Sequence, residues 1–537
     1  QIPVVRERTG LIRDKERKTL KDADMELAPD SMENLQIQQY YFYSQVTKAG
    51  EKIFFSYSKE DKKKTEKKPS FYWNKMLSVL PETKIKNIDE ELNKMLPATG
   101  RETVDMLAQK MMEEDMEDGS LYKIVRSQYK TEFDRIIEGY LYQNQSGTLH
   151  KSIVHELYGD TMTNSVSKLE TFSACCYQFF LKYGLKIKKR DEYKVESSNL
   201  GTILHGVMEQ FFLSAKEKNI DVTTLSDERR DSIVEELTVA MAKEENETIF
   251  DSGFRKRHQL SMLIRVAKRS VENLCRHLQQ GDMKPTYFEK EFSPEDKLSY
   301  IYFALEQDMK MQLKGIVDRV DIKETDDAVY FKVIDYKSGA KDIDYLKIYE
   351  GKQLQLVVYM SVMKELLERQ YPDKQVIPTG MYYYHLQDLI VDAVKEEDAE
   401  KKRMENSRLT GLVNEDETCR ILMDHKTGNV VPLRYKTDGS LYSQNKALVS
   451  GNELEQISTF VKKKMQEIGN EIVQGKIDMN PEKGEVTGPC NFCDYKNICR
   501  FEPGLGGNHY SIHANLDREE AKEKVTAKED KQNEMDK

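Results

Sequence analysis

The sequence has no long apolar run and no excess of positive charge. No uninterrupted apolar stretch approaches the roughly 18 residues of a membrane-spanning helix, and no signal peptide opens the chain. We therefore expect a cytoplasmic protein without membrane contact. Its 93 acidic and 83 basic residues give a net charge of −10, which excludes DNA binding through a general positive field. Any contact with nucleic acid must come from a local group of basic side chains.

The chain also lacks a Walker A motif and an initial methionine. The segment nearest to a Walker A motif, Gly469 to Lys476, has five residues between its glycines and no Ser or Thr after the lysine. We therefore expect no ATP hydrolysis by these residues. A length of 537 residues suits roughly two or three domains. Because the first residue is Gln1, we expect a C-terminal piece of a longer protein.

Cysteines are few, and only three of them are grouped. Cys490, Cys493 and Cys499 form a C-x2-C-x5-C pattern, whereas the others lie at positions 175, 176, 275 and 419. This spacing does not resemble a disulfide framework, and in a cytosolic protein it indicates a metal site. With one more thiolate the group suits zinc or a [4Fe-4S] cluster, and the number of ligands does not distinguish them.

Two acids end successive apolar runs in the middle of the chain. Asp318 follows Gly315-Ile316-Val317, and Asp335 is followed by Tyr336 and Lys337. Because Asp335 and Lys337 are two positions apart on a predicted strand, their side chains point to the same face. Two carboxylates and an ammonium group suit metal-dependent phosphodiester cleavage. A strand that ends in a turn explains Asp-Tyr-Lys-Ser-Gly alone equally well, but the second acid favours the catalytic interpretation.

The hydrophobic pattern predicts a mixed α/β fold. Strands are expected at residues 53–58, 286–292, about 309–322, 328–335 and 378–384. Helices are expected around His205 and Glu209, at 353–367 and at 394–410. Ser167 and Glu170 have the spacing of a capping box, which predicts another helix start. The segment 255–277 is the densest in positive charge and is a candidate phosphate contact, although a solvated helix with ordinary salt bridges explains it equally well.

Several of these features occur in the order typical of one family. The chain resembles the RecB-like branch of the PD-(D/E)XK nuclease superfamily, and within it the AddB-like subunits of bacterial ATP-dependent helicase/deoxyribonucleases. The resemblance covers most of the chain, and its motifs are specific only in combination. The segments that carry it are residues 167–175 (SKLETFSAC), 201–206 (GTILHG), 335–337 (DYK), 353–356 (QLQL) and the C-terminal cysteines.

The resemblance implies a division into domains. Residues 165–510 would form an α/β PD-(D/E)XK nuclease domain with a mixed central sheet flanked by helices. Residues 1–95 would be the C-terminal part of a helicase-like domain, and residues 96–164 a helical linker. The highly charged residues 511–537 are expected to be a disordered tail or a solvated helix.

The resemblance also implies roles for individual residues. Mg²⁺ or Mn²⁺ would be bound by side chains of the nuclease motifs and by the backbone carbonyl of Tyr336. Lys337 would position the attacking water and stabilise charge in the transition state. Gln355 and Tyr359 would line a DNA channel, with Gln353 as the alternative glutamine, and Glu209 would be a ligand, a partner of His205 or a surface residue. The residues implied to hold the catalytic metal are His205, Asp318, Asp335 and Tyr336.

AddB-like nucleases hold a [4Fe-4S] cluster with one cysteine before the nuclease motifs and three after them. That pattern assigns the cluster to Cys175, Cys490, Cys493 and Cys499. The family usually has proline after the first cysteine, whereas this chain has Cys176. Cys176 is therefore the alternative fourth ligand, although the order of the motifs favours Cys175.

The function implied is that of a metal-dependent exodeoxyribonuclease subunit. It would process DNA ends in double-strand break repair and recombination, as a heterodimer with a helicase-nuclease partner, AddA. One alternative is a non-catalytic DNA-binding or scaffold subunit of a helicase complex, against which Asp318, Asp335 and Lys337 argue. The other is a stand-alone iron–sulfur nuclease of the CRISPR-adaptation type, against which the long N-terminal region argues.

Overall fold

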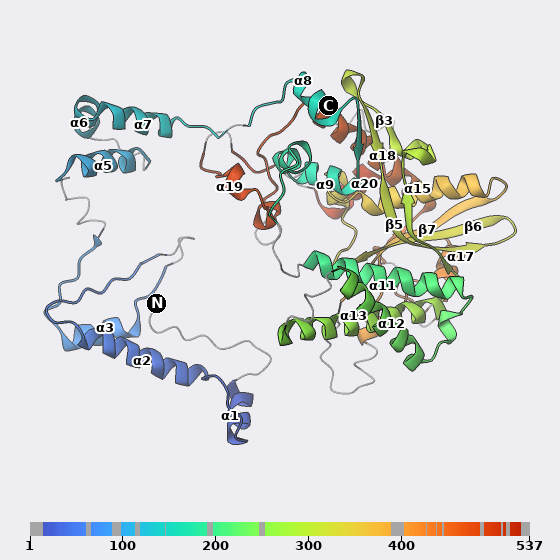
Figure 1. The fold of residues 1–537 in the computed structure, drawn as a ribbon, viewed down its shortest axis with the longest axis horizontal. Coiled ribbons are helices and arrows are strands. Elements are labelled where there is room, and N and C mark those ends of the chain that lie inside the picture. The colour runs from blue at the N-terminus through green and yellow to red at the C-terminus, as the bar shows by residue number, and fades with distance from the viewer. Residues whose placement is uncertain are drawn as a thin grey trace. The chain divides into compact units, whose positions relative to one another are not determined.

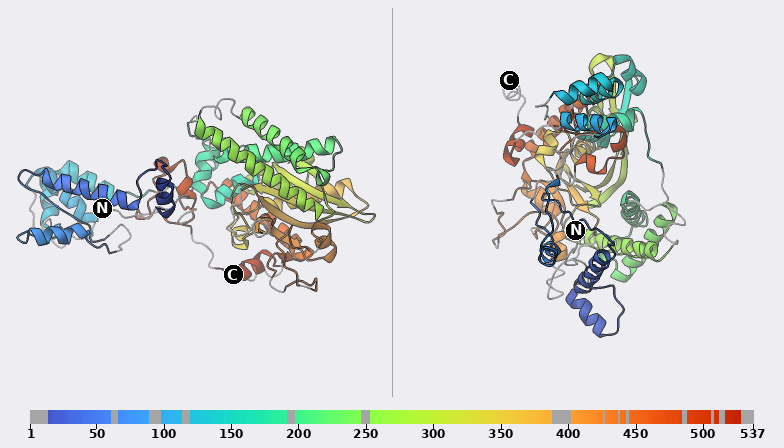
Figure 2. Two further views of the ribbon diagram at one scale, coloured as in Figure 1. Left: turned by 90° about the horizontal axis from the view of Figure 1, so that it is seen from below. Right: turned by 90° about the vertical axis from the view of Figure 1, so that its left-hand side faces the viewer.

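The structure is a computed structural model of the 537-residue chain. Contacts divide the chain into two compact units, residues 1–140 and 141–537, and each is described by itself (Figure 1 and Figure 2). The described residues are 14–60, 66–88, 98–112, 119–144, 146–190, 197–245, 253–387, 402–425, 427–436, 438–442, 445–483, 488–505, 508–511 and 516–527.

The described residues of the first unit form helices. Its small core consists of Leu107, Met111, Val125 and Phe133. Residues 53–58 form neither helix nor strand, so the predicted strand is wrong. A strand needs a neighbour for its backbone hydrogen bonds, and the described part of this unit contains no strand that pairs with it. The helices are α1 (Asp14–Asp22), α2 (Ser31–Thr47), α3 (Phe71–Val79), α5 (Gly100–Met112), α6 (Ser120–Gln128) and α7 (Lys130–Tyr140).

The second unit is built on a six-stranded sheet with the order β2-β5-β6-β7-β8-β9. Strands β6 and β7 pair in parallel, as do β8 and β9, whereas the other neighbours are antiparallel. A second sheet has the order β1-β4-β3. The strands are β1 (Thr161–Asn164), β2 (Lys284–Phe292), β3 (Tyr302–Ala304), β4 (Lys310–Leu313), β5 (Gly315–Glu324), β6 (Ala328–Lys337), β7 (Gln375–His385), β8 (Thr410–Asn414) and β9 (Leu448–Val449).

Helices cover both faces of the large sheet (Figure 1). One layer contains α9 (Val166–Ala174), α14 (Tyr345–Tyr349), α15 (Gln355–Gln370), α18 (Gly451–Val473) and α20 (Arg518–Val525). The other contains α11 (Ser197–Glu217), α12 (Asp227–Glu245) and α13 (Phe254–Gln279). The predicted mixed sheet flanked by helices is therefore confirmed. Shorter helices are α8 (Lys151–Tyr158), α10 (Cys176–Phe179), a π-helix (Phe180–Gly184), α17 (Glu417–Met423) and α19 (Lys496–Cys499).

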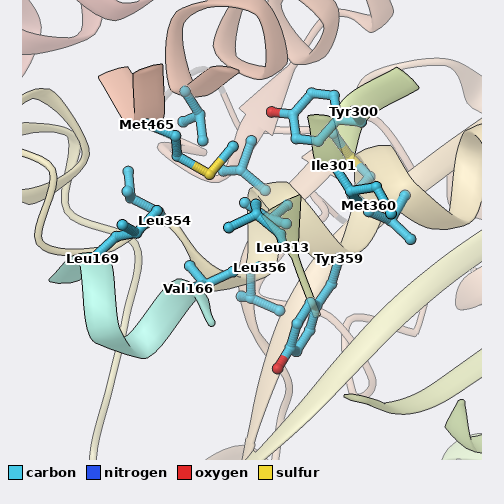
Figure 3. Close-up of a cluster of buried hydrophobic side chains, with 14 of the residues drawn as sticks. Val166, Leu169, Tyr300, Ile301, Leu313, Leu354, Leu356, Tyr359, Met360 and Met465 are labelled. Atoms are coloured by element: carbon cyan, nitrogen blue, oxygen red, sulfur yellow. The ribbon is translucent and has the colours of Figure 1, made fainter. Parts of the chain in front are cut away.

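Alternation along β6 explains why two helical layers form. Val329, Phe331 and Val333 lie in the core beneath α15, whereas Ile334 and Tyr336 lie in the core beneath α11. Figure 3 shows the first core, where α9 and α18 pack beside the start of α15. Each fully buried Leu there contributes roughly 1.5–3 kcal/mol relative to an exposed one. This packing fixes α9 and α15, which carry groups of both candidate sites.

The structure changes two further predictions. The predicted strand at 309–322 is divided at Lys314, with β4 in the small sheet and β5 in the large one, because the two segments meet different partner strands. The prediction of a disordered or solvated tail is wrong for α20, because Ala521 and Val525 are buried in the core and Lys522 pairs with Glu453 at 2.8 Å.

The predicted helix at 394–410 lies mostly outside the described residues, and Thr410 begins β8. Within the described part of the chain, every helix is too short or too polar to cross a membrane.

Candidate active site

Neighbouring strands bring the two predicted acids together. Asp318 lies on β5 and Asp335 on β6, where Arg319 is paired with Ile334. The backbone N–H of Tyr336 donates a hydrogen bond to Asp318 Oδ2 over 2.7 Å. Asp318 is 8% exposed and Asp335 is fully buried. The antiparallel ladder therefore fixes both carboxylates in the interior.

The predicted lysine and the predicted Gln–Tyr pair meet on the α15 side of β6. The Lys337 ammonium group lies 2.5 Å from Asp335 Oδ2 and donates to Gln355 Oε1 over 3.2 Å. Gln355 Nε2 in turn donates to the Tyr359 hydroxyl over 2.9 Å. Gln353 lies elsewhere, because its amide group accepts from the Asp344 N–H and donates to a backbone carbonyl in the adjoining loop. The structure thus joins Gln355, not Gln353, to the lysine.

His205 approaches the acids from α11. Its Nδ1 lies 3.4 Å from Asp318 Oδ2, and its ring packs edge-on against Tyr336. Burial lowers the pKa of His205, which favours the neutral imidazole. Neutral imidazole is the form that binds a metal ion.

Sequence reasoning missed a third acid, Glu289 on β2. Ligand atoms of His205, Glu289 and Asp318 all lie within 4.8 Å of one another. Burial, followed by the charges of Asp318, Glu209 and Asp335, raises the pKa of Glu289 to about 7. Its φ of 41° is in the left-handed region, which costs a non-glycine residue roughly 1–2 kcal/mol. The sequence shows only an acid within a strand pattern, so nothing local distinguishes Glu289 from a surface residue.

The acids of this site fit a divalent cation. Burial raises the pKa of Asp318 and Asp335, and the charge of Asp318 raises that of Asp335 further. Apart from the Lys337 ion pair, the oxygens of Asp335 have no hydrogen-bond partner among the described residues. Crowded, buried oxygen ligands are the donor set that Mg²⁺ or Mn²⁺ takes.

The site is reached through an open cleft of about 700 Å³. His205 and Glu209, one helical turn apart on α11, line one side of it. Glu289, Tyr336 and Lys337 line the sheet side. A substrate in this cleft therefore meets the imidazole, an acid and the ammonium group together.

The predicted cysteines form a second group. Cys175 follows α9, and its sulfur accepts a hydrogen bond from the N–H of Gln178 over 3.4 Å. Burial, and then the charges of Cys499 and Cys490, raises the pKa of Cys175, and Cys493 has the same effect on Cys490 and Cys499. Cys175 is therefore close to Cys490 and Cys499, and both of these are close to Cys493. Cys176 instead belongs to the hydrophobic core.

Glu170 joins the two groups, and this role differs from the predicted capping box. Helix α9 begins after Ser165 without a side-chain cap, so the predicted capping box is wrong. The carboxylate of Glu170 instead accepts hydrogen bonds from the N–H groups of Leu354 and Gln355, over 2.7 and 3.1 Å. These N–H groups belong to the first turn of α15 and have no partner within their own helix. Glu170 thus connects the helix before Cys175 to the helix that carries Gln355.

Comparison with known proteins agrees with this geometry. Residues 163–500 match the model of the PD-(D/E)XK nuclease superfamily. The chain is 29% identical to the B subunit of the ATP-dependent helicase/deoxyribonuclease of Lachnoclostridium phytofermentans over 532 residues, which are 95% of this chain and 45% of the relative. The same subunit of Clostridium tetani is also 29% identical, over 95% of this chain and 45% of its own. The chain thus spans less than half the length of these relatives.

Proposed function

We propose a function from one premise: this chain belongs to the PD-(D/E)XK nuclease superfamily. It hydrolyses DNA phosphodiester bonds with a divalent cation, Mg²⁺ or Mn²⁺. The observation that carries the proposal is the convergence of His205, Glu289 and Asp318 beside the buried Asp335 and its ion pair with Lys337. An imidazole, three carboxylates and one ammonium group in an open cleft suit phosphodiester hydrolysis better than any other reaction class.

In this proposal the cation is held by Asp318, Asp335, Glu289 and His205, with the Tyr336 carbonyl as a further ligand. When bound, such a cation polarises the phosphate and lowers the pKa of a bound water. The Tyr336 N–H restrains the Asp318 carboxylate, so this ligand is oriented before the cation arrives.

Lys337 acts on the reacting phosphate in this proposal. Its ammonium group sits between the Asp335 carboxylate and the Gln355 amide, which restrict its position. A positive charge fixed there stabilises the negative charge that develops on the phosphate in the transition state. Gln355 and Tyr359 hold each other by a hydrogen bond, and they line the path of the DNA strand next to the lysine.

The whole protein would act on DNA ends. The matched relatives are named as the B subunit of an ATP-dependent helicase/deoxyribonuclease. We extend that role to this chain as an exodeoxyribonuclease subunit for double-strand break repair and recombination, with a helicase-nuclease subunit of the AddA type as its partner.

We also propose that Cys175, Cys490, Cys493 and Cys499 hold a [4Fe-4S] cluster. A tetrahedral zinc site with Zn–S bonds of about 2.3 Å brings its sulfurs to roughly 3.8 Å from one another. Among the described residues, no three of the cysteine sulfurs lie within 4.8 Å of one another. A four-iron cluster is larger than one ion and accepts thiolates that lie farther apart, and the resemblance of the chain to iron–sulfur nucleases supports iron.

The nuclease proposal is tested by cleavage of linear single-stranded DNA in Mg²⁺. The 537-residue chain should degrade the DNA, and a chelator should stop the reaction. Asp335→Ala should remove most of the activity while the protein stays folded and still binds DNA. A folded Asp335→Ala variant that cleaves at the wild-type rate would contradict the site. Binding without cleavage by the wild-type chain would support the scaffold alternative instead.

A further inference from the structure

Three basic side chains of helix α13 are paired with neighbouring acids. Lys268 pairs with Glu235 at 2.6 Å, and Glu272 pairs with Arg276 at 2.8 Å and with Arg269 at 3.9 Å. These partners lie on α12 and on α13 itself. These three side chains of the basic segment are therefore weakened as phosphate contacts.

Two lysines lie beside Tyr183, and two more lie close enough to one of them to affect its pKa. The ammonium groups of Lys168 on α9 and Lys182 on the π-helix each lie 5.2 Å from the centre of the Tyr183 ring. Partial burial, and then the positive charges of Lys314 and Lys186, lowers the pKa of Lys168. We call these four residues, Lys168, Lys182, Lys186 and Lys314, the lysine surface.

The lysine surface lacks compensating negative charge. Across the described ranges of the chain, no carboxylate lies within ion-pair distance of these four ammonium groups. Lys182, Lys186 and Lys314 are exposed, whereas Lys168 is half-buried. Ammonium groups close together without an acid beside them repel one another, and a polyanion bound across them removes this repulsion.

The lysine surface is connected to both candidate sites by neighbouring segments of the chain. Lys314 directly precedes β5, so its Cα lies at most about 13 Å from that of Asp318, four residues along an extended chain. On the other side, Lys182 lies close enough to Tyr495 to affect its pKa, and Tyr495 lies between Cys493 and Cys499. The Tyr495 hydroxyl also donates to the carbonyl of Ile187, next to Lys186.

We propose that the lysine surface binds the phosphodiester backbone of the DNA strand that enters or leaves the nuclease site. This inference rests on the proposed function and adds the path of the strand outside the cleft. Unpaired ammonium groups at intervals along a surface suit a flexible polyanion, which needs no fixed geometry at each phosphate. Because the surface adjoins the cysteine loops, loss of the cluster should also disturb it.

The test measures DNA binding in an Asp335→Ala background, which prevents cleavage. The binding of a fluorescein-labelled oligothymidine by the 537-residue chain is followed by anisotropy over a range of salt concentrations. Lys182→Ala combined with Lys314→Ala should weaken binding about tenfold at moderate salt. It should also lower the slope of log K against log salt by about 0.7 for each lost contact.

Two ion-paired lysines serve as matched controls. The side chains of Lys268 and Lys374 are partly exposed, at 28% and 24%, and are paired with Glu235 and Glu324. Alanine at both positions should leave the slope unchanged. In the cleavage-competent chain, the Lys182/Lys314 variant should raise KM for single-stranded DNA and leave kcat unchanged. The lost contacts bind the substrate and the transition state equally well, so their removal does not change the rate of the bound complex.

The two proposals fail in different ways. If the Asp335→Ala chain binds DNA and the lysine variants keep its affinity and salt slope, the lysine surface is overturned while the nuclease proposal stands. If the wild-type chain neither binds nor cleaves DNA, the proposed function fails and this inference fails with it. A weaker affinity and a smaller slope in the Lys182/Lys314 variant alone, with an unchanged melting temperature, support the lysine surface.

Discussion

The nuclease site and the cysteine group differ in how their ligands are held. The nuclease acids lie on neighbouring strands, where the sheet ladder and the Tyr336 N–H fix them without a cation. The cysteines come from segments far apart in the sequence, and three of them lie in or beside short helical turns at 489–499. Cys490, Cys493 and Cys499 are partly exposed, whereas Asp335 is fully buried. In the proposed function, a metal in the first site would serve chemistry, whereas a metal in the second would hold distant segments of the chain together.

Among the variants that should affect one site and not the other, Lys337→Ala is expected to lower the cleavage rate most. Removing the ammonium group should lower the rate of cleavage roughly 10²- to 10³-fold, because this charge acts mainly in the transition state. Binding of single-stranded DNA and the iron content should stay at wild-type values. A parallel loss of iron would show that the two sites are not separate.

Cys499→Ser should change the properties that Lys337→Ala leaves intact, namely iron content and DNA binding. The variant should lose its brown colour, its iron and its sulfide, and unfold at a lower temperature than the wild type, because metal binding is part of the folding free energy here. DNA binding and cleavage should fall together. Cys176→Ser is the matched control, since Cys176 lies in the core and should leave the iron in place. A colourless wild-type protein with one zinc per chain would refute the iron assignment.

Glu289→Gln tests whether the third acid belongs to the catalytic metal site. Replacing one carboxylate by a neutral amide of the same shape should raise the Mg²⁺ concentration for half-maximal cleavage roughly 10- to 100-fold. Activity should return at high Mg²⁺, and iron content should not change. Glu291→Gln on the same strand is the control, because Glu291 is exposed. An unchanged Mg²⁺ dependence would remove Glu289 from the site.

The smallest effect is expected for Glu170→Ala, which breaks the connection between the two sites. Two buried N–H groups at the start of α15 would lose their acceptor, at a cost of about 1–3 kcal/mol each. We expect a roughly tenfold lower cleavage rate through displacement of Gln355, a melting temperature lower by several degrees and unchanged iron. Glu170→Gln retains one acceptor oxygen and should recover part of the rate. Equal rates for Glu170→Ala and the wild type would show that Gln355 does not depend on this contact.

Local patterns in the sequence determined much of this protein. The spacing of Asp335 and Lys337 placed both side chains on one face of a strand, and the spacing of Gln355 and Tyr359 placed both on one face of a helix. These relations depend only on the repeat of one element, so no distant contact was needed to predict them. Alternating and helical apolar patterns similarly predicted strands and helices of an α/β fold, whereas the mixed sheet flanked by helices was implied by the family resemblance.

Only the tertiary structure decided the relations between distant segments. Glu289 reaches the metal site through a left-handed backbone conformation that its own sequence does not signal. Glu170 has the spacing of a local cap, yet it accepts a hydrogen bond from Leu354, which lies 184 residues later at the start of another helix. Lys314 divides one continuous apolar pattern because its two sides pair with different strands. In each case the residue contacts a segment that is far away in the sequence. Residue types and local spacings do not predict which distant segments will come into contact.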